Sequence, residues 1–314
     1  MGRVRRPLLI PVLAVVALSA SLAACTSEPT PAPTATLRPT ATVPAAPPSA
    51  AAPPAAASSS GAARLPGAAP SQAFAVETRT LRLQRGADRL LPTTVWQPTG
   101  DGSFPLILFS HGLGGRPSDY RELLTSWARA GFVVAAPAYP HTSASATDFN
   151  VLDVINQPAD ASYVITRTLA ELGVTIDKTR IAAAGHSAGG VTTIGLFSGT
   201  RDERLRAGVV LAGRQILPQP FIGPEAPLLF VHGRQDNTVE YSDGQAAYSA
   251  VQWPKAFLSV TNGGHIASGR SLDVIATTST DFWRWALYGD QAARNRLKPD
   301  ATRGGLATLQ DNLG

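Results

Sequence analysis

The chain has 314 residues, 44% of them hydrophobic, which is enough for one sizeable core but not obviously for two. Its formal charge is +5, but Arg3, Arg5 and Arg6 supply three of those charges and leave the remainder nearly balanced at +2. Basic residues form no stripe interleaved with aromatic ones, so nucleic-acid binding has no support. The single cysteine, Cys25, excludes an internal disulfide framework and a metal site built from cysteines.

Residues 1–24 have the pattern of a signal peptide. A basic start precedes an apolar run at residues 8–18, which Pro11 interrupts and which is short for a membrane span. The Leu-Ala-Ala-Cys at residues 22–25 resembles the lipobox of bacterial lipoproteins. That resemblance implies lipidation of Cys25 and an exported cell-envelope lipoprotein, anchored to a membrane on its extracytoplasmic face. The alternative is an ordinary signal peptide with Cys25 incidental, which makes the protein secreted.

Residues 25–73 are expected to form a disordered tether. They are almost entirely Pro, Ala, Thr and Ser, with few apolar side chains larger than alanine. Such a segment cannot offset its ordering entropy by burial, so it behaves as an extended spacer. We expect one folded domain at residues 74–298 and a flexible C-terminal tail at residues 299–314.

Strands and helices alternate along the folded part. Continuous apolar runs such as residues 104–109 predict strands buried on both faces of a parallel sheet, and the apolar spacing of residues 119–130 predicts a helix. The alternation indicates an α/β fold, with a mostly parallel central sheet and helices on both faces. Strands are expected at residues 74–84, 90–97, 104–109, 132–136, 181–184, 205–212, 227–231 and 255–260, and helices at 119–130, 159–172, 188–198 and 271–288.

The Gly-His-Ser-Ala-Gly at residues 185–189 predicts a sharp turn between a buried strand and the helix that follows. Small residues are needed on both sides of Ser187, because a strand that reverses into a helix brings two backbones close together. The strained turn lifts the Ser187 hydroxyl clear of the sheet, beside the positive end of the helix. A glycine-rich turn with an accidental serine is the alternative, and other parts of the chain decide between the two.

Two further strand ends carry polar residues. Asp236 follows the apolar strand at residues 227–231, and His265 follows the last predicted strand at residues 255–260. With Ser187 they give the chain order serine, aspartate, histidine, each on the loop just past a buried strand. Because ligand sites in such sheets lie outside the carboxyl ends of the strands, we expect the three side chains to converge there.

These residues resemble the α/β-hydrolase superfamily over residues 74–290. Residues 108–115, residues 185–190 and the helix start at 157–160 look like the platelet-activating-factor acetylhydrolase, chlorophyllase and dienelactone-hydrolase-like branch, with bacterial polyester hydrolases and cutinases as close neighbours. Dienelactone hydrolase itself uses a cysteine where Ser187 stands, so its ring-opening activity is not carried over. The resemblance implies the α/β-hydrolase fold. Residues 213–226 are too few for a large helical lid.

Ester cleavage assigns a role to each of these residues. The Ser187 hydroxyl needs a base, and His265 is the candidate because imidazole is mostly neutral near pH 7. Asp236 would hold the proton on the far ring nitrogen and stabilise the imidazolium as it forms. The family takes its oxyanion donors from two backbone amides, which the resemblance places at Leu113 and Ala188.

Other carboxylates are alternatives to Asp236. Glu225, Glu240 or Asp243 could supply the acid instead, with Asp236 in a surface turn. Asp160 stands at a helix start, where we expect it to complement the helix dipole rather than to take part in catalysis.

Four other histidines compete with His265. His111 and His232 sit in His-Gly turns at strand ends and are expected to shape those loops. His186 is expected to pack beside the turn, and His141 faces either substrate or solvent. Only His265 lies beyond the last predicted strand, after a Gly-Gly pair that lets its loop fold over the sheet.

The sequence therefore predicts a serine-dependent carboxylic ester hydrolase that acts through an acyl-enzyme on Ser187. We expect an ester substrate, no metal, no cofactor and a monomer. A site without a lid permits cutinase-like or polyester-hydrolase activity, and the same machinery also cleaves amides and thioesters. Two alternatives are a membrane-tethered binding protein on this fold and a peptidase of the same fold. The chain has no room for the propeller or cap domain that such peptidases usually carry.

Overall fold

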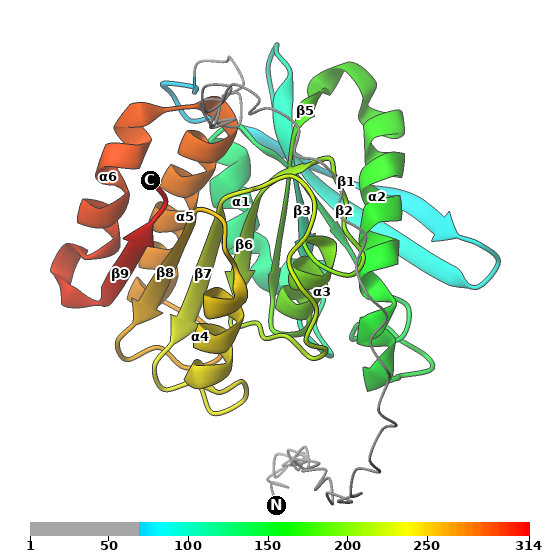
Figure 1. Cartoon of the computed structure of the whole chain (residues 1–314). Coiled ribbons are helices and arrows are strands. Elements are labelled where there is room, and N and C mark those ends of the chain that lie inside the picture. Colours follow the sequence, from blue (N-terminus) through cyan, green and yellow to red (C-terminus); the bar gives the residue numbers. More distant parts are fainter. Residues whose placement is uncertain (1–68) are drawn as a thin grey trace, which may run out of the picture. The chain divides into compact units, whose positions relative to one another are not determined.

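The computed structural model describes residues 69–314 (Figure 1). The predicted signal peptide, the lipidation site at Cys25 and most of the 25–73 tether lie outside the described residues. The first described residues already contact the fold: Ala69 packs against the core, and the Pro70 carbonyl accepts a hydrogen bond of 2.7 Å from Arg284 Nη2. The folded part therefore includes residues before residue 74, where the sequence indicates its start.

A nine-stranded sheet forms the centre of the described chain, in the order β1-β2-β4-β3-β5-β6-β7-β8-β9. The six strands from β4 to β8 in this order run parallel, and β1, β2 and β9 are antiparallel to their neighbours. The strands are β1 Val76–Arg85, β2 Arg89–Pro98, β3 Phe104–Ser110, β4 Val133–Pro137, β5 Ile176–His186, β6 Leu205–Leu211, β7 Leu228–Gly233, β8 Lys255–Val260 and β9 Ala307–Asn312.

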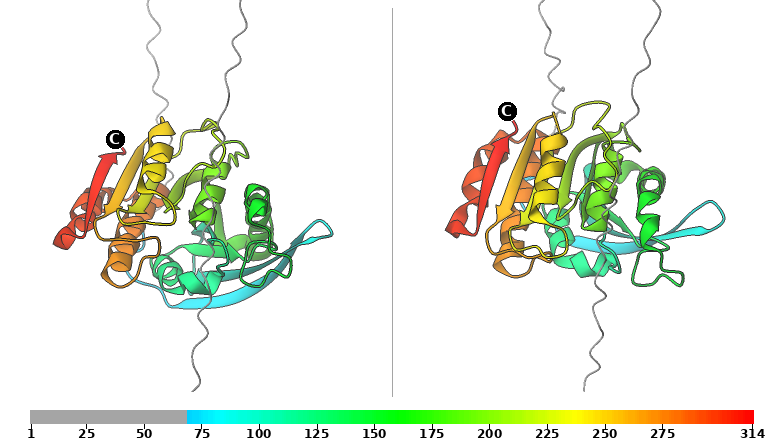
Figure 2. Two further views of the ribbon diagram at one scale, coloured as in Figure 1. Left: turned by 90° about the horizontal axis from the view of Figure 1, so that it is seen from below. Right: turned by 60° about the horizontal axis from the view of Figure 1, so that its bottom comes forward.

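Helices cover both faces of the sheet, as Figure 2 shows. One face packs against α1 Arg121–Arg129, α5 Arg270–Tyr288 and α6 Gln291–Ala301, and the other against α2 Gln157–Leu172, α3 Ala188–Leu196 and α4 Tyr241–Ala250. Short 3-10 helices lie at η1 Pro117–Tyr120, η2 Val151–Ile155, η3 Gly173–Thr175 and η4 Arg303–Gly305.

Strand β3 illustrates why these apolar runs form central strands. All seven of its residues are buried, and successive side chains enter different cores. Ile107 and Phe109 belong to the core under α1 and α5, whereas Leu106 and Leu108 belong to the core under α2 and α3. A continuous apolar run is stable in this position because both faces of a parallel sheet are covered.

The order in which the chain adds strands to the sheet reverses at β3, because β4 lies on one side of β3 and β5 on the other. The chain leaves β3 toward β4 by way of α1, and then crosses to β5 on the other side of β3 by way of α2. The loops that follow β3 and β5 therefore diverge at the carboxyl edge of the sheet. Such a switch point is where open α/β sheets bind their ligands.

The C-terminal part corrects the sequence analysis. Residues 299–314 are not a flexible tail: α6 ends at Ala301, and β9 pairs antiparallel with β8 from Ala307 to Asn312. Ala307 and Leu309 are buried, while Thr308 between them is exposed. The strand at residues 255–260 is thus the last parallel strand but not the last strand of the sheet. Helices α4 and α6 were also not predicted.

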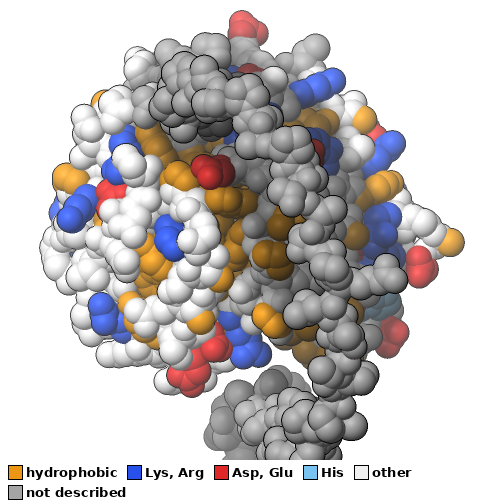
Figure 3. Space-filling model, in the orientation of Figure 1, with side chains coloured by type: hydrophobic (Ala, Val, Ile, Leu, Met, Phe, Trp, Pro, Cys, Tyr) orange, Lys and Arg blue, Asp and Glu red, His pale blue; other side chains and the backbone are white. Residues whose placement is uncertain are grey.

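None of the helices within residues 69–314 has the length and apolar character needed to cross a membrane. On the face shown in Figure 3, Lys and Arg side chains are scattered among acidic, polar and apolar groups rather than gathered into one basic patch.

Candidate active site

Ser187 occupies a strained turn between β5 and α3. Its backbone has a φ of 58° and a ψ of −119°, a left-handed conformation that residues other than glycine rarely adopt. Close backbone contacts enforce the turn, because a Cβ on Gly185 would lie 2.1 Å from the Gly189 carbonyl oxygen, and one on Gly189 would lie 1.9 Å from that of Ser110. The predicted need for small residues on both sides of Ser187 is therefore met by contacts with two neighbouring segments.

The Leu113 amide is held in a fixed direction by its own peptide group. The Gly112 carbonyl, which belongs to that planar group, accepts hydrogen bonds from Gly115 N at 3.0 Å and from His111 Nδ1 at 2.7 Å. Fixing the carbonyl fixes the opposed N–H of Leu113, which has no hydrogen-bond partner among residues 69–314. The second predicted donor, the amide of Ala188, is the first of α3 and so has no acceptor within its helix.

His111 has one proton, and its position follows from its partners. The Tyr139 amide donates to Nε2 at 3.1 Å, so Nε2 is the acceptor and Nδ1 carries the proton that goes to the Gly112 carbonyl. Burial lowers the pKa of His111, which keeps the ring neutral. The predicted loop-shaping role of His111 thus corresponds to a specific contact beneath the Leu113 amide.

Asp236 and His265 are joined by a hydrogen bond of 2.8 Å between Oδ2 and Nδ1. The other carboxylate oxygen accepts from the amides of Thr238 and Val239, each at 2.9 Å. Burial by itself raises the pKa of Asp236, but the hydrogen bonds from His265 and these amides outweigh burial and hold the pKa below its usual value. The carboxylate is therefore ionised at neutral pH and fixes the proton of His265 on Nδ1.

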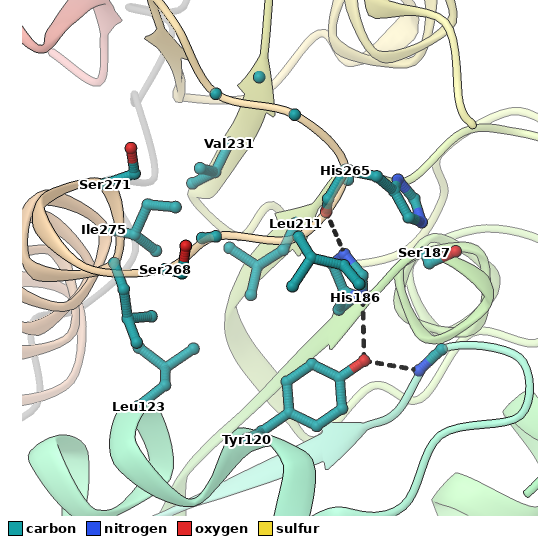
Figure 4. A pocket seen from close by; sticks show the side chains of 18 of the residues that line it. Tyr120, Leu123, His186, Ser187, Leu211, Val231, His265, Ser268, Ser271 and Ile275 are labelled. Atoms are coloured by element: carbon teal, nitrogen blue, oxygen red, sulfur yellow. Dashed lines mark hydrogen bonds between the residues drawn. The ribbon is translucent and has the colours of Figure 1, made fainter. Parts of the chain in front are cut away.

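Ser187 and His265 line the same pocket, and Figure 4 shows the imidazole of His265 beside the Ser187 hydroxymethyl group. Within residues 69–314, no hydrogen bond joins the two side chains. The structure thus joins Asp236 and His265 by a hydrogen bond and places Ser187 beside His265, without a hydrogen bond between Ser187 and His265.

The sequence profile of the Chlorophyllase family matches residues 66–212, which include the β3–α1 loop and the Ser187 turn but neither Asp236 nor His265. Together with the sheet order and the strained turn, this match decides the fold. The chain has the α/β-hydrolase fold.

Comparison with curated proteins gives distant esterase relatives. Platelet-activating factor acetylhydrolase from Bos taurus is 28% identical over 160 residues, and that from Cavia porcellus is 26% identical over 157. Each match covers 36% of this chain and 35% of the relative, so the chain spans about a third of the length of these relatives. Cutinase est1 from Thermobifida alba is 28% identical over 247 residues, which are 77% of this chain and 80% of the cutinase.

His232 has a contact in this hydrolase fold that the sequence analysis did not predict. Its Nε2 donates to the Val239 carbonyl at 3.0 Å and lies 3.3 Å from Oδ2 of Asp236. Gly244 on α4 makes room for the ring, since a Cβ there would lie 2.2 Å from His232 Nδ1. The buried His232 ring thus gives the Asp236 carboxylate a second imidazole neighbour besides His265. The four-residue spacing between His232 and Asp236 is the only signal in the sequence that could have indicated it.

His186 and His141 differ in their relation to the site. His186 packs under the turn as expected, and both of its ring nitrogens are hydrogen-bonded, to Tyr120 Oη at 2.9 Å and to the His265 carbonyl at 2.7 Å. His141 bonds within its own loop, with Nδ1 at 3.1 Å from the Asp148 carbonyl, and it does not line the pocket.

The alternative acids do not contact His265. Asp243 lies 3.2 Å from Arg214 Nη1 on the surface, and Glu240 precedes the first turn of α4. Glu225 lies on the β6–β7 connection, an exposed segment without a helix. Asp236 is the one carboxylate within residues 69–314 that is hydrogen-bonded to His265.

Asp160 is not simply a partner of the helix dipole. Its fully buried carboxylate accepts from Arg85 Nε at 2.6 Å and from Arg89 Nε at 2.8 Å. Arg89 also bonds Asp153 in η2, with Nη2 at 2.7 Å from Oδ2. The hydrogen bond that Arg89 donates to Asp160 is the largest of the effects that raise the pKa of Arg89, so the guanidinium stays charged. This network attaches η2 and the start of α2 to the β1–β2 hairpin.

A pocket of about 640 Å³ opens beside Ser187, between the loops that follow β3 and β8. Its inner wall is apolar, and its rim carries the glycines of the β3–α1 loop together with Ser268 of the β8–α5 loop and Ser271 of α5 (Figure 4). The apolar wall consists of Leu123, Leu211, Val231, Val260, Leu272 and Ile275. No cluster of three or more His, Cys, Asp or Glu side chains suited to a metal ion occurs within residues 69–314.

Proposed function

We propose that this chain is a carboxylic ester hydrolase that acts through an acyl-enzyme on Ser187. The observation that carries the proposal is the hydrogen-bonded Asp236–His265 pair beside Ser187, whose φ is positive. Ser187 and His265 line the same pocket. The distant similarity to acetylhydrolases and to a cutinase supports the same reaction class. The former are named as hydrolases of an acetyl group and the latter as an enzyme for cutin.

In the first half of the reaction the Ser187 oxygen attacks the ester carbonyl. His265 Nε2 accepts the hydroxyl proton, while Asp236 keeps the other ring proton on Nδ1 and stabilises the imidazolium. The amides of Leu113 and Ala188 donate to the oxyanion that forms on the carbonyl oxygen, so we call residues 111–116 of the β3–α1 loop the oxyanion loop. The tetrahedral intermediate then collapses, the C–O bond to the alcohol breaks, and His265 returns its proton to the departing alcohol oxygen.

In the second half, water hydrolyses the acyl-enzyme. His265 takes a proton from the water as it attacks, and it returns that proton to the Ser187 oxygen when the acid leaves. The same two amides bind the second oxyanion. For both halves the Ser187 hydroxyl must turn toward His265 Nε2. Such bonds are often open in ligand-free hydrolases and close when substrate binds.

Exposed apolar side chains near the site favour a second candidate, an enzyme for polymeric or aggregated esters. Loops that follow β3, β4 and β8 carry large apolar residues that are between 42% and 77% exposed. Leu113 and Ile266 line the pocket, whereas Phe149, Val151, Leu152 and Ile155 lie on the β4–α2 segment, whose backbone is hydrogen-bonded to the β3–α1 loop. The β6–β7 connection contains no helix that could cover them. A rim of this kind suits a substrate that presents an apolar surface, as a polyester does.

The test is an ester panel with acyl chains of increasing length, together with a polyester film. We expect hydrolysis of short esters by the wild-type protein, and Ser187→Ala should reduce turnover by about six orders of magnitude with an unchanged fold. Comparing p-nitrophenyl esters with the matching anilides separates an esterase from a peptidase. If a serine-reactive phosphonate fails to label Ser187 in folded protein, the chain is a binding protein instead.

We further propose that the protein is an exported lipoprotein, with its lipid on Cys25 and residues 25–73 as the tether. The support is the residue pattern alone. In a host that processes lipoproteins, radiolabelled palmitate should label the wild type and not Cys25→Ser. Equal labelling of both would rule out Cys25 as the lipidated residue.

A further inference from the structure

Three hydrogen bonds in series join the segments that carry the proposed catalytic groups (Figure 4). The Gly112 amide bonds Tyr120 Oη at 3.0 Å, and Tyr120 Oη bonds His186 Nδ1 at 2.9 Å. His186 Nε2 then bonds the His265 carbonyl at 2.7 Å. The series runs from the oxyanion loop, through the residue that precedes the nucleophile, to the backbone of the proposed base.

The partners fix the direction of every bond in this series. The His265 carbonyl only accepts, so the proton of His186 lies on Nε2. In a neutral ring Nδ1 is then an acceptor, so Tyr120 donates its hydroxyl proton to it. The Tyr120 oxygen in turn accepts from the Gly112 amide. Each group in the series therefore donates to the next one, from the Gly112 amide through Tyr120 and His186 to the His265 carbonyl.

Burial keeps both side chains in the protonation states that this series needs. It lowers the pKa of His186 to about 4 and raises the pKa of Tyr120 to about 12. Ring contacts hold them in place: Tyr120 packs on Phe109 with centroids 4.7 Å apart, and His186 packs on the His265 ring at the same separation. Neither ring is free to reorient without losing these contacts.

Each end of the series is adjacent to a group that the proposed reaction uses. Gly112 precedes the Leu113 amide, His186 precedes Ser187, and His265 carries the imidazole itself. We propose that Tyr120 and His186 are positioning residues, which set the distance between the oxyanion loop, the turn at Ser187 and the β8–α5 loop that carries His265. This inference rests on the proposed ester hydrolysis and assigns to these two residues no contact with the reacting atoms.

Removing the Tyr120 hydroxyl breaks two bonds at once. It leaves the Gly112 amide and His186 Nδ1 without partners inside the protein, and the oxyanion loop loses its link to the other two segments. Tyr120→Phe should therefore lower kcat about tenfold, equivalent to about 1.4 kcal/mol of barrier, while KM changes less than twofold. The rate at which a fluorophosphonate labels Ser187 should fall by a similar factor.

Tyr288→Phe is the matched control. The Tyr288 hydroxyl is also buried and donates to a backbone carbonyl, that of Gly131 at 2.6 Å, but it lies outside the pocket. Both variants should lower the melting temperature, and only Tyr120→Phe should lower kcat. Equal kcat values for Tyr120→Phe and the wild type, or an equal loss in Tyr288→Phe, would overturn the proposal.

A measurement without turnover separates this inference from the proposed function. In ¹⁵N-labelled protein at pH 7, imidazole correlation spectra should show His186 as the neutral Nε2–H tautomer, and Tyr120→Phe should shift its Nδ1 resonance. An Nδ1–H tautomer or a charged ring would overturn the series of bonds. If the tautomer is as expected and no ester is cleaved, the proposed function fails while the hydrogen-bonded series stands. If esters are cleaved and Tyr120→Phe is as active as wild type, the positioning role alone fails.

Discussion

The loops that follow β3 and β8 face each other across the pocket, but they are held in different ways. In the β3–α1 loop five of the eight backbone N–H and C=O groups of residues 112–115 are hydrogen-bonded: besides both groups of Gly112 and the Gly115 amide, the Gly114 amide donates to the Thr142 carbonyl at 2.7 Å, and the Gly115 carbonyl accepts from the Ala144 amide at 2.9 Å. In residues 264–268 of the β8–α5 loop, the His265 carbonyl, which accepts from His186, is the one backbone group that is hydrogen-bonded within the described chain.

The difference matches the tasks we assign to the two loops. Oxyanion donors must be in place before charge develops, so a rigid backbone suits the β3–α1 loop. The imidazole on the β8–α5 loop must exchange a proton with several partners, and it is held mainly by Asp236 on one ring nitrogen. Activity should therefore depend mainly on side-chain contacts in the β8–α5 loop, and mainly on backbone groups in the oxyanion loop.

After Ser187→Ala, the largest effect is expected from Asp236→Asn. An asparagine amide facing His265 Nδ1 would favour the wrong ring tautomer, and loss of the corresponding carboxylate in such a triad lowers kcat by about 10⁴. Steady-state hydrolysis of a p-nitrophenyl ester measures the loss. Asp243→Asn is the control, because that carboxylate contacts Arg214 on the surface and should leave kcat unchanged. An Asp236→Asn variant that keeps a tenth of wild-type activity would place the acid elsewhere.

A smaller effect is expected from Leu113→Pro, which removes one amide from the oxyanion loop without changing the residues that bond its neighbours. Losing one such donor lowers kcat by about 10²- to 10³-fold. Leu113→Ala keeps the amide and removes only an exposed side chain, so it should lose less than tenfold. Similar losses in both variants would mean that the side chain of Leu113, and not its amide, matters.

The smallest effect is a change in the free energy of unfolding with pH. The pKa of His186 is lowered from 6.5 to about 4 by burial, so below pH 6.5 the unfolded chain binds a proton that the folded chain does not. Unfolding free energy should therefore fall as pH drops, by about 1–2 kcal/mol between pH 7 and pH 5 from this residue, after allowing for partial exposure of the ring.

Urea titrations of the wild type and His186→Gln at both pH values isolate this contribution, because glutamine does not titrate. His111, whose pKa is also lowered, acts in the same direction in both proteins and cancels. The pH dependence should be weaker in His186→Gln. An identical pH dependence would show that His186 is protonated equally in the folded and unfolded chains.

Local sequence patterns predicted the parts of the molecule that are set by local constraints. The turn at residues 185–189 requires glycine where other backbones pass within van der Waals distance, and that requirement is visible in the motif. Strands buried on both faces need continuous apolar runs, so β3 and β4 were predicted within a residue of their ends. Asp236 and His265 were chosen because each follows such a run.

Features that depend on pairing across the fold were missed. Helix α4 buries only Gly244, Ala247 and Tyr248, too few to give a helical apolar pattern. Strand β9 alternates over six residues but draws its stability from the free edge of β8. The contacts of Tyr120 and His232 join residues whose proximity no spacing in the sequence reveals, apart from the short step between His232 and Asp236.

The pairing of β9 has a practical consequence for anyone who shortens this protein. Removing residues 306–314 would strip six backbone partners from β8 and uncover Leu258 and Val260, which Leu309 and Ala307 face in register. An apolar strand with bare amides and carbonyls along one side is a template for pairing with other molecules. A version trimmed before β9 should therefore precipitate or form strand-linked oligomers, even though every residue of the pocket is still present.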